Sequence, residues 1–141
     1  MNLSEANLFS HQERVTRWQL NMTLNLFVGF EEEPTGLEYL MRKRGYTSIE
    51  KHKDYLIFER ASNPWPRVFY SPHVEKVDNP EDGPNWDDAG FDVVSEVNIN
   101  FPHSDIPVWS EATELSDQLV RELQGILYDP EADEYSTKAD I

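Results

Sequence analysis

The stretch that decides the fold is WQLNMTLNLFVGF, residues 18–30. Apolar residues stand at every second position from Trp18 to Phe30, and polar Gln, Asn and Thr fill most of the positions between them. Side chains alternate between the two faces of a β-strand, so this pattern predicts a long strand with one face in the core. The polar side chains of the other face indicate a surface that is solvated or that lines a groove.

The residues after this strand predict a helix. Thr35 and Glu38 have the spacing of a capping box, and Gly45 stands where a helix C-terminal cap is expected. The basic triplet Arg42–Arg44 complements the dipole of the last helical turn, which accounts for it better than an anion site does.

The remaining chain continues with strands and one longer helix. We expect strands at residues 53–60, 67–74 and 91–101, a helix at 108–124 with an apolar stripe at helical spacing, and a short strand at 126–128. Residues 75–90 read as a polar loop, long enough to be unusual in a compact domain unless it is functional or mobile.

The expected order is therefore strand, helix, three strands, helix and short strand. It predicts an α+β two-layer sandwich, with two helices on a mostly antiparallel sheet of four to five strands, as a variant of the ferredoxin-like topology. A chain of 141 residues suits one domain, 1–141. We expect its N-terminal segment, 1–15, and its acidic tail, 129–141, to be mobile.

The net charge of −15 lies entirely in the second half of the chain. Residues 1–70 hold nine acidic and nine basic residues, whereas residues 71–141 hold eighteen acidic and three basic ones. A field of one sign repels nucleic acid and anionic membranes and speeds encounter with a basic partner. Halophilic adaptation would acidify both halves, so the asymmetry favours a basic protein partner, with no direct binding of nucleic acid or membrane.

Missing motifs exclude several classes of function. The chain has no cysteine, which rules out disulfides, thiolate metal sites and a cysteine nucleophile. It also lacks a nucleophile elbow, a glycine-rich phosphate loop and a His-Glu-x-x-His pair. The acidic loop fails the EF-hand pattern because Pro80 and Ala89 stand at ligand positions, which leaves only weak Ca²⁺ binding of another geometry open.

These exclusions shape the remaining expectations. We expect no cofactor and no resident metal, and the chain favours binding over catalysis. It begins without the basic start and apolar run of a signal peptide and contains no apolar segment of bilayer length, so we expect a cytoplasmic protein.

The leading hypothesis is a non-catalytic acidic binding protein of the inhibitor, immunity or nucleic-acid-mimic type. Trp86, flanked by acids, would anchor the contact, although core packing explains a tryptophan there equally well. The expected partner-binding residues lie in the loop and on the longer helix: Asp82, Trp86, Asp87, Asp88, Asp92, Glu111, Glu114, Asp117 and Glu122.

Two alternatives stay open. A small-ligand-binding domain or modest enzyme requires a polar-aromatic pocket, and convergence of two histidines in a deep pocket would favour it. Its candidate residues are Asn21, Thr23, Asn25, Tyr55, Tyr70, His73 and His103. A structural subunit of a larger assembly would instead expose an apolar patch or edge strand.

Overall fold

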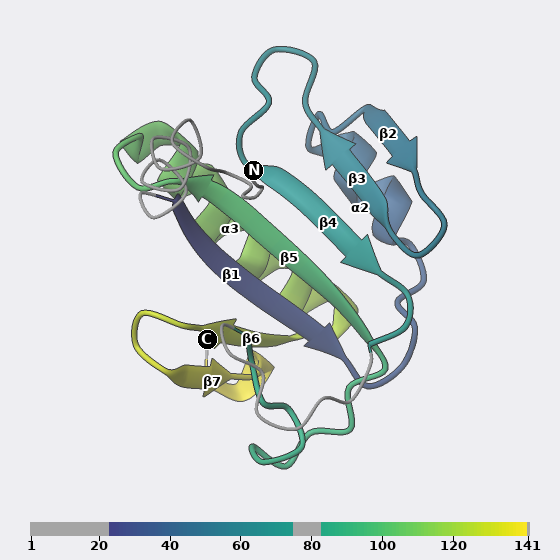
Figure 1. Cartoon of the computed structure of the whole chain (residues 1–141), viewed down its shortest axis with the longest axis vertical. Helices are drawn as coiled ribbons and strands as arrows, with labels where there is room; N and C mark the ends of the chain where they lie inside the picture. The colour runs from purple at the N-terminus through teal and green to yellow at the C-terminus, as the bar shows by residue number, and fades with distance from the viewer. Residues whose placement is uncertain (1–22, 75–82, 141) are drawn as a thin grey trace, which may run out of the picture.

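The computed structural model describes residues 23–74 and 83–140, which form a seven-stranded antiparallel sheet with two helices behind it (Figure 1). The strands follow the order β2-β3-β4-β5-β1-β6-β7 across the sheet. They are β1 (Thr23–Phe30), β2 (Ser48–Lys51), β3 (Leu56–Glu59), β4 (Arg67–Ser71), β5 (Ser95–Pro102), β6 (Ile126–Asp129) and β7 (Glu134–Ser136). The helices are α2 (Leu37–Lys43), α3 (Ile106–Leu123) and a 3-10 turn, η1 (Lys138–Asp140).

The expected α+β class, with helices against an antiparallel sheet, is confirmed, but the sheet has seven strands rather than four to five. The two unexpected strands, β2 and β7, are short, polar and at the two edges of the sheet. An edge strand needs no apolar face, so neither shows the alternation that reveals a strand in sequence. β7 lies in the segment 129–141, which we expected to be a mobile tail, and it pairs with β6.

The helix-covered face of the sheet carries the main core. β1 and β5 pair along their whole length, so that Val28 lies opposite Val97 and Leu26 opposite Ile99. α3 packs across these two strands and buries one stripe of its side chains, in accord with the helical spacing. It begins at Ile106 rather than 108, because Asp105 caps it by accepting a hydrogen bond from the backbone N of Val108.

Among the described residues, the segment 83–94 packs on part of the opposite face of the sheet. Trp86 and Val93 pack over Gly29 of β1, where a Cβ atom would stand 2.9 Å from Trp86 Cζ2 and 2.8 Å from Val93 Cγ2. We expected a single strand at 91–101, which would include Phe91 and Val93. β5 instead starts at Ser95, and these two residues join a small core on the opposite face, because glycine leaves room there.

No helix within residues 23–74 and 83–140 is long and apolar enough to cross a bilayer.

Candidate docking groove

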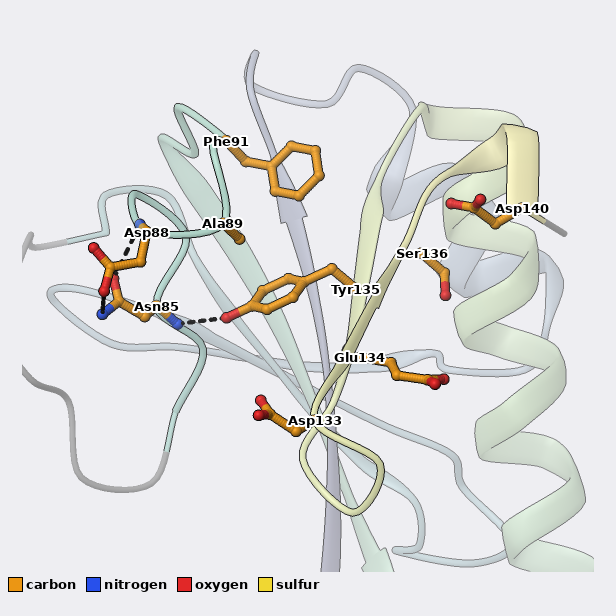
Figure 2. Close-up of a pocket in the computed structure, with 9 residues that line it drawn as sticks. All are labelled: Asn85, Asp88, Ala89, Phe91, Asp133, Glu134, Tyr135, Ser136 and Asp140. Atoms are coloured by element: carbon orange, nitrogen blue, oxygen red, sulfur yellow. Dashed lines mark hydrogen bonds between the residues drawn. The ribbon is translucent and has the colours of Figure 1, made fainter.

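A groove of about 900 Å³ lies between the segment 85–91 and strand β7 (Figure 2). We call it the acidic groove. Four of its nine lining residues are acidic, and none is basic. It is lined by Asn85, Asp88, Ala89, Phe91, Asp133, Glu134, Tyr135, Ser136 and Asp140.

Tyr135 joins the two walls of the acidic groove. It leaves β7 toward the loop, and its hydroxyl accepts a hydrogen bond of 2.8 Å from the backbone N of Asn85 (Figure 2). Its ring centroid lies 4.6 Å from that of Tyr128, 5.6 Å from Trp86 and 6.1 Å from Phe91. This aromatic cluster holds together two segments that lie about fifty residues apart in the chain.

Trp86 holds the segment 85–91 against the sheet through buried contacts. Only 5% of its surface is exposed, so it packs in the core and offers no anchor to a partner. Its indole Nε1 donates a hydrogen bond of 2.8 Å to Oε1 of Glu96 on β5. Burial raises the pKa of the Glu96 carboxyl, and the hydrogen bond from Trp86 opposes part of that rise.

Three of the four carboxylates of the acidic groove accept hydrogen bonds from neutral donors. Asp88 accepts a hydrogen bond of 2.8 Å from the Asn85 amide, and Asp133 accepts one of 3.0 Å from the Tyr128 hydroxyl. Burial, together with this bond to Asp133, raises the pKa of Tyr128 to about 12. Asp140 accepts from the backbone N and the hydroxyl of Thr137. Neutral donors fix these side chains in place without cancelling their charge.

The other loop acids lie near the groove but do not line it. Asp87 and Asp92 are exposed on the same segment as Asp88, and the backbone N of Asp92 donates to Glu31. Asp82 lies outside the described residues.

The acids of α3 have other surroundings. Glu111 forms a bidentate ion pair with Arg44, at 2.7 and 3.2 Å, and accepts a hydrogen bond of 2.9 Å from the Tyr46 hydroxyl. This residue therefore ties the end of α2 to α3, which is a structural role rather than a docking one. Glu114 and Glu122 are exposed and Asp117 is half-buried, and none of them lines the acidic groove.

The residues of the alternative pocket are not brought together. Tyr55 stacks on His52 at the β2–β3 turn, Tyr70 is buried in the main core, and His103 follows β5 beside Trp109. β4 and β5 are antiparallel, so His73, which follows β4, lies at the opposite end of β5 from His103.

Two pocket candidates lie on β1, and one is outside the described chain. Thr23 begins β1, and Asn25 accepts hydrogen bonds from Asn98 and Asn100 of β5. Asn21 lies outside the described residues. Within residues 23–74 and 83–140, no three or more His, Asp or Glu side chains form a cluster suited to a metal ion.

Sequence reasoning missed the hairpin side of the groove, namely Asp133, Glu134, Tyr135 and Asp140. A signal for it exists in ILYD-PEAD-EYS, residues 126–136, where two short apolar-polar runs flank a turn that contains Pro130. Read as a hairpin, this run places Tyr128 opposite Tyr135, as the structure does.

The chain matches no protein-family profile, no curated protein and no solved structure.

Proposed function

We propose that this protein is a non-catalytic binding protein whose acidic groove docks on a lysine- and arginine-rich surface of a protein partner. The observation that supports this most is the composition of the groove. Its carboxylates surround two aromatic rings, and no basic side chain is among its lining residues.

Charge and aromatic surface favour the same kind of group. Asp88 and Asp133 are oriented by neutral hydrogen bonds, so a guanidinium or ammonium group would meet pre-organised negative charge. Tyr135 and Phe91 add aromatic rings, whose faces attract cations. The net charge of −15 would steer a basic surface toward the groove and raise the rate of association more than the affinity.

The residues that we propose for docking differ from those expected from the sequence, because they now follow the lining of the acidic groove. Asp88 remains, Asp87 and Asp92 extend the acidic surface beside it, and the hairpin acids take the place that we first gave to Trp86 and Glu111. Inhibitor, immunity and nucleic-acid-mimic proteins all use acidic surfaces in this way, and the proposal covers each of these types.

A pair of charge-matched variants tests the proposal. The groove variant combines Asp88→Asn, Asp133→Asn and Glu134→Gln, which keep the shape of the side chains. The control combines Glu31→Gln, Glu32→Gln and Glu33→Gln, three exposed acids between β1 and α2 that do not line the groove. Both variants lose the same charge, so the long-range field of the protein falls equally.

Binding of a mixed Lys/Arg oligopeptide is then measured by calorimetry at low and high salt. We expect the groove variant to lose about tenfold in affinity at low salt, roughly 1.4 kcal/mol, and the control to lose much less. Equal losses in the two variants would show a diffuse field without a docking site and would contradict the proposal. The same pair identifies natural partners, since a true one is retained by the control and lost by the groove variant.

A further inference from the structure

A second hollow, of about 200 Å³, lies between α3 and the sheet, lined by residues of β1, β5 and β6. Its walls include Leu26, Phe101 and Leu127, and Trp109 of α3 also lines it. The carboxylates of Asp129 and Glu131 belong to the same hollow. A dry cavity of about 150 Å³ accepts benzene, so this space suits one phenyl or branched aliphatic side chain.

The hollow exists because Ser116 interrupts the buried stripe of α3. Its side chain is fully buried, and its hydroxyl donates a hydrogen bond of 2.8 Å to the backbone O of Thr113. The Thr113 hydroxyl in turn donates to the backbone O of Trp109 at 3.0 Å. Both hydroxyl protons are used within the helix, so neither hydroxyl is available to donate a hydrogen bond to an occupant of the hollow.

The surface around the hollow is also apolar. Ile106 is 70% exposed and Trp109 is 41% exposed, although both are large hydrophobic side chains. A neighbouring hollow of about 310 Å³ shares Trp109 and Thr113 with the first and adds Ile106 and Glu114. Exposed apolar side chains that gather around a hollow with an acidic border are typical of an interaction site.

Both hollows are lined by acidic residues and no basic ones, as the acidic groove is. Glu114, Asp129 and Glu131 line them, and no lysine, arginine or histidine is among the lining residues. An apolar side chain that enters would therefore be favoured when its neighbours in sequence are basic.

Strand β6 connects this hollow to the acidic groove. Alternation along β6 directs Leu127 and Asp129 to the helix-covered face, whereas Tyr128 packs in the cluster on the opposite face that Tyr135 joins. The hairpin of β6 and β7 thus carries one site on each face, and β7 is the edge of the sheet. One segment that passes around this edge would reach both sites.

We propose that the hollow beneath Trp109 takes a single Phe or Leu side chain from a basic segment of the partner, and so acts as an apolar anchor site. This inference rests on the proposed function, because the cationic character of the segment comes from docking in the acidic groove. The occupant is a protein segment rather than a small amine, since the exposed Ile106 and Trp109 extend the apolar surface well beyond the hollow.

Two peptides and three variants test the anchor site. The peptides are Lys/Arg oligomers that differ only in one central residue, Phe or Ala. Ser116→Leu fills the hollow, Trp109→Ala removes an exposed side chain that lines it, and the control Ser116→Ala leaves the hollow open. Each variant is first checked by thermal melting, so Trp109→Ala carries the test if Ser116→Leu fails to fold.

We expect the unmodified protein to bind the Phe peptide about tenfold more tightly than the Ala peptide, as burial of one apolar side chain at a partly wet site would give. That ratio should fall to about one in Ser116→Leu and in Trp109→Ala, and persist in Ser116→Ala. Binding of the Ala peptide and its salt dependence should stay the same in all three variants.

The experiment distinguishes failure of the anchor site from failure of the groove proposal. Equal, salt-sensitive binding of both peptides to the unmodified protein would overturn the anchor site and leave the groove proposal standing. Persistence of the ratio in both Ser116→Leu and Trp109→Ala would likewise place the Phe side chain elsewhere and overturn it. Binding of neither peptide would overturn both proposals.

Discussion

Carboxylates in the acidic half of the chain have two kinds of hydrogen-bond partner, cationic on α3 and neutral in the acidic groove. Glu111 on α3 is neutralised by Arg44, which comes from the other half of the chain, and accepts a further bond from Tyr46. Asp88 and Asp133 in the acidic groove accept hydrogen bonds from an amide and a phenol, which leave their charge in place. A count of acids therefore does not locate a docking face, because the partners of each acid decide whether its charge remains uncompensated at the surface.

Several basic residues of the first half of the chain are neutralised by acidic partners in the same way as Glu111 is by Arg44. Arg67 pairs with Glu59 at 2.9 Å, Arg42 pairs with Glu38 at 3.1 Å, and Arg44 reaches α3. Within the described residues, the first half thus places several of its cations on nearby acids. The acidic groove has no basic residue in its lining and keeps its negative sign.

Removal of Trp86 should have the largest effect on stability, because this residue holds the loop wall of the acidic groove. Trp86→Ala deletes a buried indole and leaves Glu96 without its donor, so we expect a loss of about 3 kcal/mol in the free energy of unfolding. Trp86→Phe keeps most of the packing and should cost clearly less. Urea unfolding measures both, and a loss below about 1 kcal/mol in Trp86→Ala would show that the loop does not depend on this contact.

Removal of Glu111 should have the next largest effect, because this carboxylate connects α3 to Arg44 and Tyr46. Glu111→Ala leaves the fully buried Tyr46 hydroxyl without its acceptor and removes the bidentate partner of Arg44. Arg44 is half-buried and keeps Gln118 and Glu114 as partners, so we expect a loss of about 2 kcal/mol, less than for a fully buried pair. The matched change Glu114→Ala, at a carboxylate that is 70% exposed, should cost no more than about 0.5 kcal/mol. Similar losses in the two variants would refute the structural role that separates Glu111 from the surface acids.

Glu96 on β5 is a half-buried acid whose carboxylate accepts a hydrogen bond from the neutral indole of Trp86. Burial raises its pKa in the folded protein above the ordinary value of 4.5, so its ionisation opposes folding. The stability that this group contributes is present below about pH 4.5 and is lost as the pH rises through the raised pKa.

Glu96→Gln removes that dependence and keeps an acceptor for Trp86. We expect the variant to melt at a higher temperature than the unmodified protein at neutral pH, and the difference to disappear near pH 4. Thermal melts across this range measure it, with the exposed change Glu134→Gln as the control. A Glu96→Gln variant that is less stable at neutral pH would contradict the account of a carboxyl destabilised by burial.

The parts of the fold that sequence could predict are those whose pattern is local. β1 and α3 repeat their apolar residues with periods that identify a strand and a helix directly. β2 and β7 carry no such pattern because they are short polar edges. The crossing of Val93 to the other face depends on Gly29, which belongs to a different strand.

The candidate site also contains residues that the local sequence predicts and residues whose surroundings depend on distant parts of the chain. Asp88 was expected from the density of acids in its loop, and Asp87 and Asp92 lie exposed beside it. The burial of Trp86 depends on Tyr128 and Tyr135, and the pairing of Glu111 depends on an arginine 67 residues away. These contacts are non-local, so no window of sequence contains them.

The most direct test of the central claim is an NMR titration of the isotope-labelled protein with a mixed Lys/Arg oligopeptide at low salt. We expect the backbone amide shifts to concentrate at residues 85–91 and 133–140, the two walls of the acidic groove, and high salt to reverse them. Shifts spread evenly over the acidic surface, or centred on Glu31–Glu33 instead, would contradict it.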